Sequence, residues 1–130
     1  MSTYLLDTHT FVWSVAAPEQ LGPTARAVIE DPASTLLVSA ASAWEVATKV
    51  RVGRWPDAAS INDRFGELIT RLRATELPVT VGHALRAGAL RWDHRDPFDR
   101  MLAAQSFIEF APLVSRDRAF TELAGLELVW

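Results

Sequence analysis

The chain has 130 residues, 49% hydrophobic and 22% charged, which predicts one globular domain and excludes a disordered or fibrous protein. It has no cysteine, which excludes disulfides and thiolate metal sites. The formal net charge of -3 argues against nucleic-acid binding by bulk attraction alone. No apolar run approaches membrane-spanning length, so we expect a soluble, cytoplasmic protein.

Short apolar runs alternate with helix-period segments along the whole chain. The predicted strands cover residues 3–7, 35–40, 76–80, 111–117 and 126–130, and the predicted helices cover 9–16, 24–31, 40–52, 60–74, 81–91 and 97–109. Apolar strands separated by helices indicate a parallel sheet that is covered on both faces. The sequence therefore predicts an α/β fold, a three-layer α/β/α sandwich with a central, mostly parallel sheet, in a single domain spanning residues 1–130.

Two aspartates stand three positions apart in "RDPFDRMLAAQ", where the helix at 97–109 begins. Asp96 is predicted to be its N-cap, because Pro97 suits the first helical position. Asp99 would then lie in the first turn, where an acid can reach back to the N–H of the capping residue and favours the positive end of the helix dipole. For Asp96 or Asp99 considered alone, a structural role at the start of the helix and a functional role are equally good interpretations.

Four acids fall at one edge of the predicted sheet. Asp7 ends the first strand, Asp117 follows the fourth, Glu45 lies one turn into the helix after the second, and Asp99 begins the helix before the fourth. Loops at the carboxyl ends of parallel strands form the usual ligand crevice. Each acid alone has a local explanation, as a turn or cap residue or, for Glu45, as an i,i+4 partner of Lys49. Local explanations give no reason for all four to converge.

Converging carboxylates need a counter-charge. Two of them about 4 Å apart repel by roughly 4 kcal/mol at an effective dielectric constant near 20, so the cluster must bind protons or a cation. Oxygen ligands without cysteine or a histidine pair point to Mg²⁺ or Mn²⁺. The chemistry that such a site supports is phosphodiester hydrolysis with a metal-bound water.

At these residues the chain resembles a known family. It is similar to the PIN-domain ribonucleases, and among them to the VapC-type toxins of bacterial type II toxin-antitoxin systems. The resemblance covers essentially the full length and is carried, in the order of the family, by "LLDTHTFVW", "SAASAWEVATKVRVGR", "LPVT", "DHRDPFDRMLAAQ", "LVSRDRAF" and "LELVW". Gln105 is a mild departure, since the family usually has a small residue there.

The resemblance implies an activity, a site and partners. Asp7, Glu45 and Asp99 would form the acidic core of a Mg²⁺ or Mn²⁺ site, with Asp117 as a fourth, more variable acid, and Asp96 would cap the helix that presents Asp99. The activity would be endonucleolytic cleavage of single-stranded or loop RNA. A VapB-type antitoxin would neutralise the toxin, the chain would form a homodimer, and operator DNA would be contacted only through the antitoxin.

Aromatic and basic residues leave several questions open. We expect Trp13, Trp44 and Trp130 to pack in the core or an interface, whereas Trp55 and Trp92, beside polar turns, are left open between packing and stacking on bases. Surface or capping roles are expected for His9, His83 and His94. The remaining group is Arg100, Arg116 and Arg118, for which contacts to RNA phosphate and salt bridges to the nearby acids are equally good interpretations.

Two other functions are compatible with parts of the pattern. The first is a phosphoryl-transfer domain with an aspartyl nucleophile at Asp7. It is disfavoured because a haloacid-dehalogenase-like fold needs aspartate at residue 9, which is histidine, and a receiver fold needs a lysine late in the chain, whereas the only lysine is Lys49. The alternative that remains is a catalytically inactive PIN scaffold that serves as a binding module. Mutually repelling carboxylates argue against that alternative, because a scaffold has no need of them.

Overall fold

A five-stranded sheet forms the centre of the computed structural model, which describes residues 2–130. Its strands are β1 (Thr3–Leu6), β2 (Thr35–Ser39), β3 (Thr75–Leu77), β4 (Leu113–Val114) and β5 (Leu128–Val129). They lie in the order β3-β2-β1-β4-β5, and each neighbouring pair is parallel. All five carboxyl ends therefore meet at one edge of the sheet.

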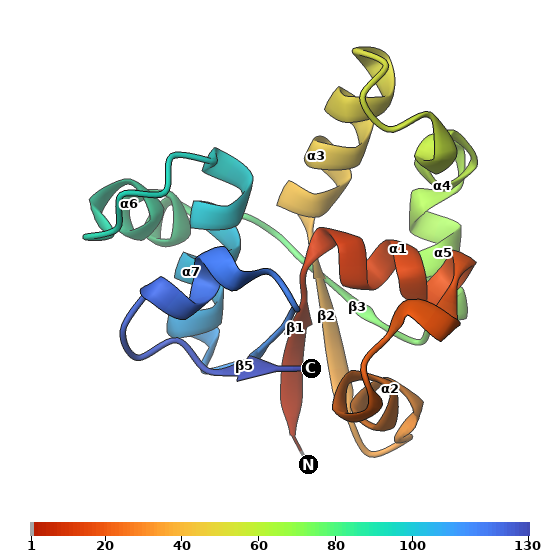
Figure 1. The fold of residues 1–130 in the computed structure, drawn as a ribbon, viewed down its shortest axis with the longest axis horizontal. Helices are drawn as coiled ribbons and strands as arrows, with labels where there is room; N and C mark the ends of the chain where they lie inside the picture. The colour runs from red at the N-terminus through yellow and green to blue at the C-terminus, as the bar shows by residue number, and fades with distance from the viewer. Residues whose placement is uncertain (1) are drawn as a thin grey trace.

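Helices cover both faces of the sheet (Figure 1). On one face lie α1 (Thr8–Ala16), α2 (Pro23–Glu30), α4 (Ala59–Asp63) and α5 (Phe65–Arg71), and on the other lie α6 (Val81–Ala89) and α7 (Pro97–Glu109). The remaining helix, α3 (Ala40–Arg51), continues from the carboxyl end of β2, and three short 3-10 turns are η1 (Pro18–Gln20), η2 (Pro56–Ala58) and η3 (Arg118–Glu122). The predicted three-layer α/β/α fold with a parallel sheet is confirmed.

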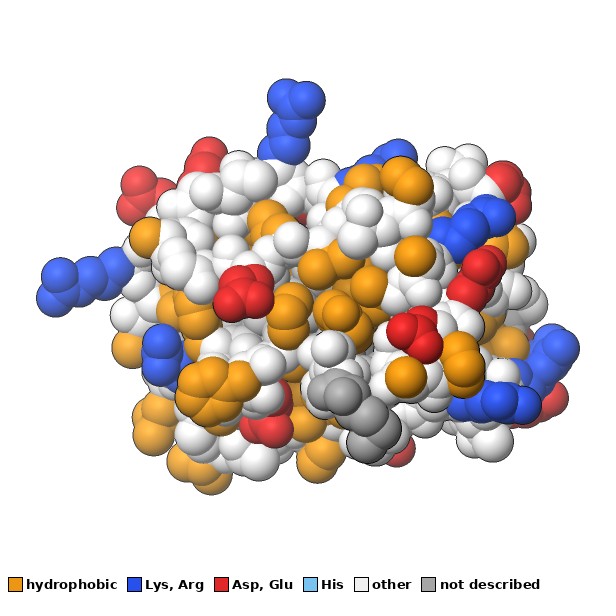
Figure 2. Space-filling view, turned by 90° about the horizontal axis from the view of Figure 1, so that it is seen from below, with side chains coloured by type: hydrophobic (Ala, Val, Ile, Leu, Met, Phe, Trp, Pro, Cys, Tyr) orange, Lys and Arg blue, Asp and Glu red, His pale blue; other side chains and the backbone are white. Residues whose placement is uncertain are grey.

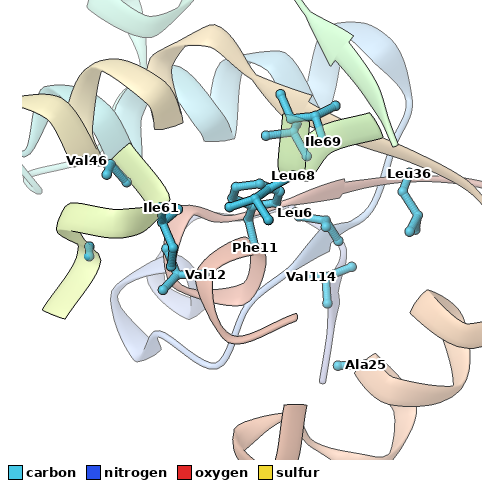
Figure 3. Close-up of a cluster of buried hydrophobic side chains, with 12 residues drawn as sticks. Leu6, Phe11, Val12, Ala25, Leu36, Val46, Ile61, Leu68, Ile69 and Val114 are labelled. Atoms are coloured by element: carbon cyan, nitrogen blue, oxygen red, sulfur yellow. The ribbon is translucent and has the colours of Figure 1, made fainter. Parts of the chain in front are cut away.

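The core is split by the sheet because successive strand residues point to opposite faces. Leu6 and Val114 belong to the cluster that packs against α1, α4 and α5, with Phe11 near its centre (Figure 3). Leu5 and Leu113, their chain neighbours, belong to the second cluster, which packs against α7. This alternation explains why the strands are apolar on both faces and why helices must cover each side.

The predicted element boundaries are wrong in two respects. The strands are shorter than predicted, and β3 ends at Leu77 because Pro78 has no N–H to continue the ladder. The single helix predicted over 60–74 is divided into α4 and α5 at Arg64, whose φ of −125° is not helical. Asn62, Asp63 and Gly66 around this break all have low helix propensity, and their apolar neighbours still reach the core.

The tryptophans only partly meet expectation. Trp13 and Trp130 do pack together, with ring centroids 5.9 Å apart, and Trp130 joins the first core cluster. Trp44 does not pack in the core, because 61% of this residue is exposed, and its packing in an interface stays a prediction. It makes an edge-to-face contact with Phe98 at 4.7 Å, since it lies on the outer side of α3 beside the start of α7. Trp92 packs against Phe120 in the second cluster.

The surface at the opposite end from the carboxyl edge of the sheet carries dispersed charge. Figure 2 shows hydrophobic side chains gathered near its centre, with acidic and basic side chains scattered around them. Within residues 2–130, no helix is both long and apolar enough to cross a membrane.

Candidate active site

The predicted acids come together in one cavity at the carboxyl edge of the sheet. The cavity has a volume of about 440 Å³. Its acidic lining residues are Asp7, Glu45, Asp96, Asp99 and Asp117, and its other lining residues are Thr8, His9, Trp13, Lys49 and Arg116. The structure thus gathers all four predicted site residues, together with the capping residue Asp96, from segments that span more than a hundred positions of the chain.

Asp7 is placed by the crossover from β1 to α1. Its Oδ1 atom accepts a hydrogen bond from the Thr10 N–H at 2.7 Å, so that it is the N-cap of α1 and not the last residue of β1. The residue is only 7% exposed. Burial raises the pKa of the Asp7 carboxyl, while hydrogen bonds from Ser115 and Thr10 oppose that rise. A buried carboxylate at this position favours any cation that enters the cavity.

Glu45 lies on the second turn of α3 and is 3% exposed. The helix begins at Ser39, whose hydroxyl accepts a hydrogen bond from the Ala41 N–H, so the strand and helix are joined without a loop. The Glu45 Oε2 atom forms an ion pair with Lys49 one turn later. The local interpretation of Glu45 as an i,i+4 partner of Lys49 is therefore confirmed, and both residues nevertheless line the cavity.

Asp96 and Asp99 are placed by the start of α7. The Oδ1 atom of Asp96 accepts hydrogen bonds from the N–H groups of Phe98 and Asp99, which confirms its prediction as the N-cap. Asp99 does not reach back to the capping residue as predicted. Its Oδ2 atom instead accepts a hydrogen bond from Nε2 of His94 at 2.7 Å.

Asp99 has a strongly perturbed environment. Its pKa is raised to about 6, chiefly by burial; the hydrogen bond from His94 opposes the rise, and the neighbouring Asp96, Glu45 and Asp117 carboxylates contribute to it. The contributions of Asp96, Glu45 and Asp117 to this shift agree with their placement beside Asp99 in the cavity. A cation bound there would offset the repulsion among these carboxylates.

Asp117 is an exposed member of the site. It is the N-cap of η3, accepting a hydrogen bond from the Ala119 N–H at 2.9 Å, and its own N–H donates to the Ser115 hydroxyl. Ser115 is 2% exposed and also donates to Asp7. The hydroxyl therefore connects the first and fourth acids of the cavity.

The histidines have three separate roles. His83 is a buried capping residue as expected, because its Nδ1 accepts the Thr80 N–H while its N–H donates to the Thr80 hydroxyl. His9 is exposed and lines the cavity. His94, through its hydrogen bond to Asp99, belongs to the site although sequence analysis left it among surface or capping roles. Its position five residues before Asp99 was the available signal, and the turn between them decided the contact.

The three arginines near the acids also differ. Within residues 2–130, Arg100 does not line the cavity and forms no salt bridge, so the salt-bridge interpretation is wrong for it, whereas contact with RNA phosphate stays a prediction. Its guanidinium donates to backbone carbonyl groups at the end of α6 and in the segment between α6 and α7, at Ala87, Gly88, Leu90, Trp92 and His94. Arg116 does line the cavity, with its guanidinium 4.5 Å from the centre of the Trp13 ring, whereas Arg118 does not line it.

The donor set suits a hard divalent cation, because it consists of carboxylate oxygens. Among residues 2–130, however, no three Asp, Glu, His or Cys side chains stand close enough together to hold a metal ion. Two of the candidate ligands are already engaged, Glu45 with Lys49 and Asp99 with His94. The residues therefore fit a cation in chemistry and location, and binding one requires side-chain movement.

Comparison with known proteins agrees with this geometry. Residues 4–126 match the model of the PIN domain family. The chain belongs to the PIN domain family. None of the curated protein sequences matches it. The family membership that the sequence motifs predicted is confirmed, and the parallel sheet with acids at its carboxyl edge is the PIN fold of this chain.

Solved structures with this PIN fold include toxin-antitoxin proteins. The VapBC2 complex of Rickettsia felis bound to a promoter DNA fragment matches with a TM-score of 0.70 and 16% identity, over 97% of this chain and 96% of that one. A toxin-antitoxin complex from Klebsiella pneumoniae matches with a TM-score of 0.64 and 16% identity, over 95% of this chain and 94% of that one. VapBC-1 of nontypeable Haemophilus influenzae matches with a TM-score of 0.64 and 17% identity, over 97% of this chain and 96% of that one. At these identities the likeness establishes the fold.

Proposed function

We propose that this PIN domain is a divalent-cation-dependent endoribonuclease whose site consists of Asp7, Glu45, Asp99 and Asp117. The observation that carries the proposal is the placement of all four carboxylates on one cavity at the carboxyl edge of the parallel sheet. Asp7 and Glu45 are nearly fully buried, and within residues 2–130 Asp7 has no cationic partner, which is costly for a buried carboxylate. A fold does not retain such a group for stability alone.

The cofactor that fits is Mg²⁺ or Mn²⁺, held by these four acids. When bound, such a cation activates a water molecule and offsets the charge that develops on the phosphate oxygens. The residues of the chain prepare the site for it. Thr10 and Ser115 fix the orientation of Asp7, while the Asp96 cap fixes the first turn of α7 and hence the position of Asp99. Lys49 forms an ion pair with Glu45 and His94 hydrogen-bonds Asp99, and a bound cation would replace both contacts.

The substrate and partners follow from the family resemblance and the structural matches. The substrate class is single-stranded or loop RNA, because an open cavity of this kind admits an unpaired strand. The toxin-antitoxin complexes of the three bacteria support a VapC-type toxin role with a VapB-type antitoxin as partner. A homodimer that contacts operator DNA only through the antitoxin, in the cytoplasm, completes the proposal.

One observation favours the alternative of an inactive PIN scaffold that acts as a binding module. Residues 2–130 present no preformed group of three metal-binding side chains, and Lys49 already neutralises Glu45. The two functions differ in what a cation does. An enzyme binds Mn²⁺ in this cavity and cuts RNA with it, whereas a scaffold does neither.

The deciding experiment uses the purified, partner-free chain with total RNA, with and without Mn²⁺, followed by mapping of new RNA ends and by calorimetric Mn²⁺ titration. Asp7→Asn and Asp99→Asn each remove one ligand charge and keep the side-chain shape. Asp63→Asn is the matched control, because Asp63 is exposed and lies outside the cavity. We expect cleavage and Mn²⁺ binding in the parent and in Asp63→Asn, and loss of both in the two site variants. A parent that binds no Mn²⁺ and leaves RNA intact would establish the scaffold.

A further inference from the structure

A row of rings and cations lies along one side of the acidic cavity. This aromatic rim consists of four residues that line the cavity, His9, Trp13, Lys49 and Arg116, and of Trp55, which packs behind His9 and Lys49. The His9 ring stacks on Trp55 with centroids 4.4 Å apart and planes 23° apart, and it lies 5.6 Å from Trp13. The Arg116 guanidinium lies 4.5 Å from the Trp13 ring centre, and the Lys49 Nζ lies 5.8 Å from that of Trp55. Cations thus stand at both ends of a run of aromatic rings.

Core packing accounts for only part of the aromatic rim. Trp13 and Trp55 are half-buried, and Trp55 packs against the first core cluster. His9 and Arg116, in contrast, are exposed and line the cavity. Within residues 2–130 the Arg116 guanidinium forms no ion pair, although several carboxylates line the same cavity. An exposed imidazole and an unpaired guanidinium, each held against a ring, form a ready contact surface for a ligand.

The chemistry of this surface matches an unpaired nucleotide strand. Aromatic faces stack on bases of any sequence, and cations beside them contact the backbone, which together is the usual way of binding single strands. Arginine that rests on a ring is already oriented for bidentate phosphate contact. The chain as a whole has a net charge of -3, so attraction of a polyanion must come from local groups such as these.

We infer that the aromatic rim binds single-stranded RNA beside the acidic cavity, with a base stacked on His9 and a backbone phosphate on Arg116. Lys49 contacts a second phosphate once its ion pair with Glu45 is released. The RNA identity of the strand rests on the proposed nuclease function, whereas the binding surface itself rests on the geometry of the rim. A duplex does not fit this mode, because its bases are not free to stack on protein rings.

The test measures binding without cleavage. A short fluorescein-labelled oligouridine is titrated with the full chain in EDTA, and fluorescence anisotropy is recorded at several salt concentrations. The variants are His9→Ala and Arg116→Gln, and the matched control is Arg118→Gln, which removes the same charge two residues away and outside the cavity. Circular dichroism of each variant verifies that it is folded.

We expect His9→Ala to weaken binding by at least about fivefold, the lower end of the effect of losing one stacked base. In a plot of log affinity against log salt concentration, the negative slope should become shallower by about 0.7 in Arg116→Gln, because one phosphate contact with the single strand is lost. Arg118→Gln should change neither quantity, and an unlabelled RNA duplex should compete poorly.

The outcomes separate this inference from the nuclease proposal. If the parent does not bind the oligouridine, or if both rim variants bind it like the parent, the inference is wrong even where RNA is cut in Mn²⁺. If the duplex competes as well as the single strand, stacking on the rim is also refuted. If the parent binds and the rim variants do not, the binding surface stands even where no RNA is cut.

Discussion

The Nε2 atom of His94 lies 2.7 Å from the Oδ2 atom of Asp99, at the start of α7. This hydrogen bond favours the charged carboxylate, while burial and three neighbouring acids disfavour it and raise the Asp99 pKa to about 6. The opposition of these effects means that Asp99 changes protonation close to physiological pH. A bound divalent cation would also favour the carboxylate, through its positive charge.

The raised pKa of Asp99 predicts that the metal-free protein becomes less stable as pH rises. Because Asp99 binds its proton more tightly in the folded state, its contribution to stability is fully present below about pH 4 and is lost between pH 4 and 6. The loss amounts to at most about 3 kcal/mol, and Asp7 acts in the same direction. Denaturant unfolding in EDTA at a series of pH values measures it.

Asp99→Asn is the control for this pH dependence. The variant cannot titrate at position 99, so its stability should fall less between pH 4 and 6 than that of the parent. An identical fall in both proteins would assign the pH dependence to other groups.

Replacing Asp7 by asparagine and by alanine should have different effects on stability. Asparagine retains an oxygen that can accept the Thr10 N–H and removes a buried charge, so Asp7→Asn should unfold at a denaturant concentration equal to or above that of the parent. Asp7→Ala loses the cap of α1, which costs about 1 kcal/mol relative to Asp7→Asn. Urea unfolding of both variants at neutral pH checks the difference, and equal stabilities would show that the cap contributes nothing.

Removing the ammonium group of Lys49 should favour cation binding and weaken the metal-free fold. Lys49→Met retains an aliphatic side chain against Trp55 and leaves Glu45 buried without its partner. We expect a loss of roughly 1–3 kcal/mol in EDTA, below the cost of breaking a fully buried pair because Lys49 is partly exposed. Mn²⁺ affinity should rise, since no ammonium competes for Glu45.

Calorimetric Mn²⁺ titration and unfolding in EDTA measure these two effects. Arg51→Met is a control for removal of a positive charge, because Arg51 is exposed and lies two residues after Lys49, at the end of α3. Weaker Mn²⁺ binding in Lys49→Met than in Arg51→Met would contradict competition between lysine and cation.

The Arg100 side chain should be essential for the segment that carries His94. Its guanidinium donates to five carbonyl groups between Ala87 and His94, and lysine has only three donors on one nitrogen. Arg100→Lys should therefore cost roughly 1–3 kcal/mol of unfolding free energy, because several partly buried carbonyl groups lose their partners. Arg118→Lys, at an exposed position, should stay within about 0.5 kcal/mol of the parent. Equal effects of the two substitutions in urea unfolding would show that the carbonyl contacts of Arg100 are dispensable.

The sequence by itself determined the fold class and the local caps. Apolar strands between amphipathic helices require a covered parallel sheet, and a parallel sheet brings its strand-end acids to one edge. Asp96 was identifiable as a cap because its hydrogen bonds reach only two and three residues along the chain. Such short-range contacts depend on residue order, which the sequence states directly.

Only the tertiary structure decided which partners the site residues have. The pairing of Asp99 with His94, the carbonyl contacts of Arg100 and the exposure of Trp44 depend on the path of the turn before α7 and on the angle between packed helices. The aromatic rim likewise joins α1, α3 and the turn after β4. These contacts link residues whose distance is set by packing in three dimensions, and residue order alone does not fix that distance.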